Sequence, residues 1–363
     1  MLELDSPVTL WISILVSVLA IFFVAIFWQQ LYKRTFPNFL YRLFVLILCQ
    51  ILILISAGLV INRSNGFYAS WNDLFGKGTD YSKVATSTSA NSKIDAKFLR
   101  SAEITPYGQA IVKEIVKGEK SGISNIVYLV IPRSAVANIE NGQPIEMANT
   151  KVIELLAGYP SQPEIWFRAL DIAKAMDRAE KSNPGVSLIG VIPAVNVAGK
   201  ADLECMNFPN NGIQTETWLT TDVRNFVNRR LGISPARWGV MGVSTGGWCS
   251  AMLSIKHEDL FASAISIAGY YRPALAKSTD PAVAAQLVKD YDFAKLQAAM
   301  TGKMNMLLIT SKGDRYSYRE TTKFQALSHP NINYQYKEIA TGGHNARVWI
   351  SQLGFALNWF IKS

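Results

Sequence analysis

A serine flanked by glycines is the residue best suited to chemistry in this chain. The segment Arg237–Gly247 reads RWGVMGVSTGG and places Ser244 between Gly242 and Gly246, after a short apolar run and before a helix-compatible segment. A sharp turn from strand to helix raises such a hydroxyl out of a sheet, where it can act as a nucleophile. A structural serine in a glycine-rich turn would show the same pattern. The prediction therefore needs a base and an acid.

His344 is the histidine whose position suits a general base. It lies in the segment TGGHN, after an alternating apolar strand pattern and before the last helical segment. Loops at the carboxyl edge of a parallel sheet bring such groups together. We interpret His257, at the end of the helix after Ser244, and His329, before a proline, as surface and turn residues. A structural loop histidine is the alternative for His344.

A third residue must orient the imidazole and stabilise its protonated form. Asp314 follows the apolar segment Met304–Thr310 and gives the chain order Ser, Asp, His that α/β-hydrolases have. Glu320 is its main competitor, and Asp314 could instead cap a helix.

Acyl transfer also requires N–H groups that stabilise the oxyanion of a tetrahedral intermediate. We expect one from the backbone of Thr245, at the start of the helix after the serine. The other is expected from the loop Ala157–Pro160, which follows an earlier strand. Pro160 has no N–H, so the amide of Tyr159 is the candidate.

These segments together resemble the esterase family that includes the actinobacterial mycolyltransferases and the S-formylglutathione hydrolases. The resemblance is carried by GVSTGGWC around Ser244, by LLAGYP, IQTETW and TGGHN, and by FYASWNDLFG at Phe67–Gly76, which is typical of a membrane-anchored branch. It implies an α/β-hydrolase fold and ester hydrolysis or acyl transfer outside the membrane. Glu216 and Trp218, in the QTETW segment, are candidates for the substrate pocket; ordinary helix-start residues are the alternative.

Two apolar runs near the N-terminus predict membrane helices. Val8–Trp28 is uncharged over about 20 residues, enough to span a bilayer. Phe39–Ile61 holds only Arg42, near one end, where its side chain can reach the interface. A cleaved signal peptide is the competing interpretation of the first run. It is disfavoured because Glu3 and Asp5, rather than basic residues, precede a long apolar core.

The loop Gln29–Asn38 between the two runs carries Lys33 and Arg34, whereas the N-terminal flank is acidic. The positive-inside rule places this loop in the cytoplasm and both ends outside. We therefore expect a multi-pass plasma-membrane protein whose domain after Ile61 is extracytoplasmic.

Cysteine usage fits an oxidising compartment. Cys49 lies in the second apolar run, which leaves Cys205 and Cys249 for the outer domain. An even count predicts a Cys205–Cys249 disulfide that ties a loop to the helix after the serine; two buried thiols are the alternative. Neither zinc-ligand spacing nor a phosphate-binding glycine loop is present, so we expect no metal and no cofactor.

The formal net charge of +9 over 363 residues is spread along the chain. Basic residues do not alternate with aromatics, so we expect no nucleic-acid partner. Proximity to anionic lipid or cell-wall polymer would explain the charge, as would a simply solvated basic surface.

We divide the chain into two transmembrane helices (1–62), a juxtamembrane aromatic segment with a polar linker (63–105) and an α/β-hydrolase domain (106–363). In the last part a hairpin precedes alternating strand and helix patterns, which predicts a mostly parallel sheet covered on both faces. The expected strands are Gln109–Val116, Asn125–Ile131, Lys151–Leu156, Val186–Ala194, Arg237–Val243, Ala262–Ile267, Met304–Thr310 and Tyr334–Ile339, and the expected helices are Pro163–Lys181, Thr215–Arg230, the segment after Ser244 to Lys256, and Asn345–Ile361.

The sequence thus predicts a membrane-tethered extracytoplasmic serine esterase or acyltransferase that acts through an acyl-enzyme on a lipid or cell-envelope ester. A non-catalytic envelope interaction protein with the same fold is the alternative from another class, and a peptidase on this scaffold is a further one. The chain order of Ser244, Asp314 and His344 favours catalysis.

Overall fold

The computed structural model describes residues 4, 6–29, 36–65, 71–74, 81, 84, 86–88, 93–100, 102–198 and 203–363. Chain contacts divide it into two units, residues 1–78 with 345–347, and residues 79–344 with 348–363. The basic loop residues Lys33 and Arg34 lie outside the described residues, as does most of Phe67–Gly76.

Two long apolar helices, α1 (Pro7–Phe27) and α2 (Phe36–Asn65), form most of the first unit. Both are long and apolar enough to cross a membrane. Three serines connect the two helices: the hydroxyls of Ser17 and Ser56 lie 3.0 Å apart, and Ser56 donates to Ser13 at 3.1 Å. Small hydroxyl side chains let two apolar helices approach closely and still satisfy their polar atoms. The short helix α3 (Trp71–Leu74) follows.

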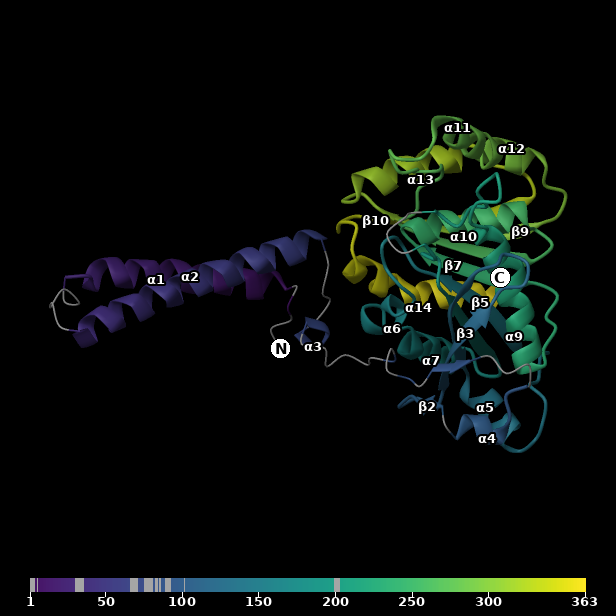
Figure 1. The fold of residues 1–363 in the computed structure, drawn as a ribbon, viewed down its shortest axis with the longest axis horizontal. Helices are drawn as coiled ribbons and strands as arrows, with labels where there is room; N and C mark the ends of the chain where they lie inside the picture. The colour runs from purple at the N-terminus through teal and green to yellow at the C-terminus, as the bar shows by residue number, and fades with distance from the viewer. Residues whose placement is uncertain are drawn as a thin grey trace. The chain divides into compact units, whose positions relative to one another are not determined.

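One sheet organises the second unit (Figure 1). Within the described residues the sheet has ten strands. Nine of them run in the order β1-β3-β4-β6-β5-β7-β8-β9-β10, and the tenth, β2, pairs with β3. Strands β3 and β4 form the expected antiparallel hairpin, β4 also pairs antiparallel with β6, and the pairs from β6 through β10 are parallel. The strands are β1 (Thr86–Thr88), β2 (Glu103–Ile104), β3 (Ala110–Lys117), β4 (Ser124–Ile131), β5 (Thr150–Leu156), β6 (Ser187–Pro193), β7 (Trp238–Val243), β8 (Phe261–Ile267), β9 (Met304–Ser311) and β10 (Ile332–Ile339). The prediction of a mostly parallel sheet is confirmed.

Helices cover both faces of this sheet, as the alternation along β7 illustrates. Val240 lies in the same apolar cluster as Trp248 of α10. Gly239, on the opposite face, leaves room for the ring of Phe360 in α14, which a Cβ at this glycine would clash with. Figure 1 shows α10 and α14 on opposite sides of the sheet. The helices are α4 (Ala96–Leu99), α5 (Arg133–Glu140), α6 (Ile165–Arg168), α7 (Ile172–Ser182), α8 (Thr215–Thr217), the short π-helix η2 (Trp218–Asp222), α9 (Val223–Leu231), α10 (Thr245–Lys256), α11 (Pro281–Asp290), α12 (Phe293–Ala298), α13 (Arg315–Ala326) and α14 (Ala346–Lys362).

Two expected segments differ from the structure. The helix expected over 163–181 is divided into α6 and α7, because Asp171 adopts a left-handed backbone conformation with φ of 46°. Residues 86–88 and 93–100, expected as part of a linker, pack on the domain instead. Strand β1 pairs with β3, and the side chains of Ile94 and Leu99 are buried.

A buried carboxyl lies in the central strand β5. The side chain of Glu154 is fully buried, and neither of its oxygens has a hydrogen-bond partner among the described residues. Burial raises the pKa of Glu154 from 4.5 to about 8, although the charge of Arg224 opposes this. The carboxyl is therefore mostly protonated in the folded chain at neutral pH.

This titration makes the free energy of unfolding depend on pH between about 4.5 and 8. The pKa of Glu154 is higher in the folded than in the unfolded chain. The contribution of its neutral carboxyl to the free energy of unfolding is therefore complete below the unfolded value of 4.5 and is lost as the pH rises through about 8. We expect Glu154→Gln to gain stability relative to the wild type between about pH 5 and 8, by up to about 1.4 kcal/mol per pH unit. Chemical denaturation of the detergent-solubilised chains at both pH values measures this difference. A constant difference would show that Glu154 does not titrate on folding.

Candidate active site

The turn at Ser244 connects β7 directly to α10. Ser244 has φ of 57° and ψ of −122°, a conformation that non-glycine residues rarely adopt. The turn is so tight that a Cβ at Gly242 would overlap the carbonyl of Gly246. The glycines of the motif thus permit a close approach of backbone, and the hydroxyl of Ser244 is left at the carboxyl edge of the sheet.

The serine, histidine and aspartate singled out in the sequence meet at this edge. His344 Nε2 lies 2.8 Å from Ser244 Oγ, and His344 Nδ1 lies 2.5 Å from Asp314 Oδ2. A carboxylate can only accept a hydrogen bond, so Nδ1 of the neutral imidazole must carry the proton and donate it to Asp314. Nε2 then has no proton and can accept the one from Ser244. The ring of His344 also packs edge-on against Trp349, with centroids 5.1 Å apart.

Parallel pairing of β9 with β10 holds the acid beside the base. Asp314 follows β9 and caps α13, where it accepts the backbone N–H of Ser317 at 3.2 Å. The loop after β9 is bonded to the loop after β10, since Ser311 Oγ donates to the carbonyl of Gly342 at 2.6 Å. A Cβ at Gly313 would overlap that same carbonyl, so the two loops are in close contact.

Glu320 has other partners. It lies in α13 with its side chain 7% exposed, and it pairs with Arg319 at 3.1 Å, Lys323 at 3.2 Å and Arg272 at 3.6 Å. Burial raises the pKa of Glu320, but the hydrogen bonds of Lys323 and Arg319 outweigh it, and the pKa is lowered. The geometry therefore brings Asp314, and not Glu320, to the imidazole.

Both candidate oxyanion donors lie next to the nucleophile. Thr245 begins α10, and the first N–H groups of a helix have no intrahelical acceptor. A Cβ built at Gly158 would come within 2.9 Å of the Cβ of Ser244, so the loop that carries the Tyr159 amide lies against the serine. Asn196 fixes this loop: its amide donates to the carbonyls of Gly158, at 3.3 Å, and Ser161, at 2.5 Å. Asn196 was not predicted as a site residue, because its only signal in the sequence is that a polar residue follows shortly after a buried strand.

Glu216 and Trp218 make their hydrogen bonds away from Ser244. Glu216 bonds to Lys256 at 2.8 Å and His257 at 2.7 Å, both at the opposite end of α10 from Ser244. Burial raises the pKa of Glu216, but His257 and Lys256 outweigh it and hold the value near 2. Trp218 is fully buried and donates to the carbonyl of Ala194 at 3.0 Å. The side chains of both residues are thus buried in the core of the domain.

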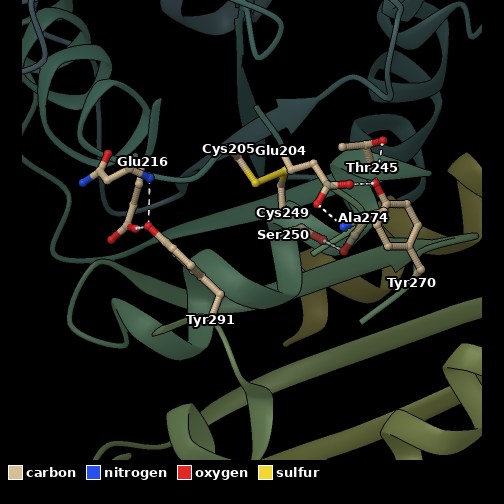
Figure 2. Close-up of a disulfide and its surroundings, with 11 residues drawn as sticks. Glu204, Cys205, Glu216, Thr245, Cys249, Ser250, Tyr270, Ala274 and Tyr291 are labelled. Atoms are coloured by element: carbon tan, nitrogen blue, oxygen red, sulfur yellow. Dashed lines mark hydrogen bonds between the residues drawn. A yellow bond between two sulfur atoms is a disulfide. The ribbon is translucent and has the colours of Figure 1, made fainter. Parts of the chain in front are cut away.

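Cys205 and Cys249 are joined in a disulfide that links the segment before α8 to α10 (Figure 2). Cys49 is a free, buried cysteine in α2. Among the described residues no group of three or more His, Cys, Asp or Glu side chains could hold a metal ion.

The chain is similar to known proteins in family and in fold. Residues 146–360 match the family model Esterase, described as "Putative esterase". An uncharacterized protein of Corynebacterium glutamicum is 23% identical over 228 residues, which cover 58% of this chain and 52% of the relative. The chain thus spans about half the length of the curated relative that it matches.

Solved structures show the same fold. A ferulic acid esterase has a TM-score of 0.56 at 15% identity, covering 70% of this chain and 98% of its own. The S-formylglutathione hydrolase of Staphylococcus aureus gives 0.55 at 18% (70% and 99%), and that of Agrobacterium tumefaciens gives 0.56 at 16% (71% and 96%). At such identities the likeness concerns the fold, and it confirms the predicted α/β-hydrolase architecture.

The two candidate acids can be separated by matched amide substitutions. We expect Asp314→Asn to lower kcat on p-nitrophenyl acetate by about a thousandfold or more, because the amide no longer stabilises the protonated imidazole. Asparagine caps a helix about as well as aspartate, so α13 should remain intact. Glu320→Gln should change kcat by less than about threefold, since its cationic partners are largely solvent-exposed. A larger loss in Glu320→Gln than in Asp314→Asn would reverse the assignment.

Proposed function

Because the chain belongs to the Esterase family of α/β-hydrolases, we propose that it is a serine esterase with Ser244 as nucleophile, His344 as general base and Asp314 as the acid that orients it. The observation that carries this proposal is the continuous hydrogen-bonded path from Ser244 Oγ through the imidazole to the carboxylate of Asp314. Such a path is what a serine hydroxyl needs to become nucleophilic at neutral pH.

The reaction follows from these positions. Ser244 Oγ attacks the ester carbonyl carbon while its proton moves to His344 Nε2, and Asp314 stabilises the resulting imidazolium. The carbonyl oxygen becomes an oxyanion that accepts from the backbone N–H groups of Thr245 and Tyr159. Collapse of this intermediate expels the alcohol, which takes the proton from His344 and leaves an acyl-enzyme. Water or an acceptor hydroxyl then attacks the acyl carbon in the same way, and so releases Ser244.

Fluorophosphonate labelling tests the activated serine. We expect the solubilised wild type to label, and Ser244→Ala to lose the label because it lacks the attacking oxygen. His344→Ala should label at least about a hundredfold more slowly because no base accepts the proton. If folded wild-type protein does not label, the esterase proposal is wrong and the domain serves as an interaction module.

We further propose that α1 and α2 anchor the esterase in the plasma membrane with its catalytic domain outside, and that its substrate is a lipid or cell-envelope ester. The lengths and apolar composition of both helices support the anchor. The Cys205–Cys249 disulfide supports an oxidising compartment. Transfer to an acceptor hydroxyl, in place of hydrolysis, would use the same acyl-enzyme.

Protease treatment of intact cells tests the orientation. We expect added protease to remove the esterase domain from whole cells, because the basic loop between the helices stays in the cytoplasm. Immunoblotting with an antibody against the C-terminal helix follows the loss, and a cytoplasmic marker must remain intact. A domain that is degraded only after cell lysis would contradict the orientation.

For the substrate class, lipid esters should compete with p-nitrophenyl acetate, and failure to compete would exclude them.

A further inference from the structure

The segment from Glu204 to Glu216 is attached to α10 at three levels, of which Figure 2 shows the first two. At the start of α10, Glu204 reaches Thr245 through the hydroxyl of Tyr270. The disulfide to Cys249 follows one turn later, and Glu216 bonds to the far end of the helix. Thr245 and Lys256 are 11 positions apart, so at 1.5 Å per residue the first and last attachments are about 17 Å apart along the axis. Only the first adjoins the candidate nucleophile.

At the first attachment, the hydroxyl of Tyr270 lies between Glu204 and Thr245. Tyr270 Oη donates to Glu204 Oε1 at 2.5 Å, and the backbone N–H of Ala274 donates to Glu204 Oε2 at 2.6 Å. The hydroxyl of Thr245 lies 3.0 Å from Tyr270 Oη. The single phenol proton of Tyr270 is within reach of both Glu204 Oε1 and Thr245 Oγ1, so the phenol links the carboxylate to the side chain of the residue that follows Ser244.

The backbone at Glu204 adopts an unfavourable conformation to make these contacts. Glu204 and Cys205 have φ values of 46° and 56°, in the left-handed region that residues with a Cβ avoid. The side chain of Glu204 is also almost fully buried. Two adjacent unfavourable residues persist only where surrounding contacts hold them, and such sites commonly serve a function.

We propose that Glu204 and Tyr270 are positioning residues for the oxyanion hole, acting through Thr245. By holding the Thr245 side chain, they fix the direction of its backbone N–H, and small errors in that direction weaken stabilisation of the transition state. The inference rests on the proposed esterase function. Charge alone predicts the opposite effect, because a buried carboxylate near a developing oxyanion opposes it, and its removal would speed the reaction.

The far end of α10 offers a matched control. There Tyr291 Oη donates to Glu216 Oε2 at 2.6 Å, so the same pair of side-chain types is buried at the other end of α10. We expect Glu204→Gln and Tyr270→Phe to lower kcat on p-nitrophenyl acetate about tenfold or more, with KM within about threefold. Glu216→Gln and Tyr291→Phe should keep kcat within about threefold while changing thermal stability. Fluorophosphonate titration counts the active sites in every sample, so that misfolded protein does not lower the apparent kcat.

A thionoester substrate reports on the oxyanion hole itself. Sulfur accepts hydrogen bonds poorly, so an intact hole favours the oxygen ester over its thiono analogue. We expect the ratio of kcat/KM values, ester to thionoester, to fall at least about fivefold in Glu204→Gln and Tyr270→Phe and to stay unchanged in the two controls. Thr245→Val should lower the ester-to-thionoester ratio likewise. Thr245→Ser, which keeps the hydroxyl, should have the ratio of the wild type.

The outcomes separate the two proposals. An inactive, unlabelled wild type contradicts the esterase function. An active wild type whose kcat and ester-to-thionoester ratio are unchanged in Glu204→Gln and Tyr270→Phe contradicts only the positioning role. Faster turnover in Glu204→Gln would show that the charge, and not the position, of Glu204 matters.

Discussion

The left-handed turn at Ser244 is the constraint on which the rest of the site depends. A residue with a Cβ avoids this conformation, so the surrounding structure must compensate for it. Close packing around Gly242 on one side and Gly158 on the other holds the turn from both directions. The sheet supplies the rigid frame, because β7 is paired with β5 and β8 along its length. The direction of the chain at this turn is thus what leaves the Ser244 hydroxyl clear of the strand that carries it.

Helix α10 links this turn to the remainder of the domain. Its first residue supplies a candidate oxyanion donor, and its last turn is fastened to Glu216. The same chain segment, 204–216, is bonded to both ends and to Cys249 between them. A helix held at three levels cannot tilt without breaking buried contacts. Precise placement of Thr245 is therefore a property of the whole segment, to which Glu204 contributes the contact nearest the chemistry.

Much of the fold was predictable because local patterns determine it. The parallel strands read as apolar runs, and the helix after Ser244 has the bounds expected from the sequence. Chain order at the carboxyl edge of the sheet was enough to select Ser244, Asp314 and His344, which the structure brings together. The break at Asp171 was not predictable, because a left-handed residue in an amphipathic pattern leaves no periodic signal.

Contacts between distant residues were the part that sequence could not supply. Glu204 and Tyr270 are 66 positions apart, and Asn196 bonds to a loop 35 to 38 positions earlier. No spacing rule connects such pairs. Glu216 lies near recognisable motif residues in the chain, which is why the sequence suggested it for the site. Its hydrogen-bond partners, however, are at the end of α10 that is remote from Ser244. Proximity along the chain was a poor guide to proximity in the fold.

Three buried carboxyl groups show how environment decides the use of the same side chain. Glu216 is surrounded by donors and cations, so its pKa falls to about 2 and its charge anchors the end of α10. Glu154 has no hydrogen-bond partner among the described residues, and burial raises its pKa to about 8. Glu204 accepts a hydrogen bond at each oxygen and fixes geometry at the nucleophile. A buried carboxylate that accepts several hydrogen bonds thus holds the groups around it in place. A buried carboxyl group without donors, such as Glu154, makes stability depend on pH.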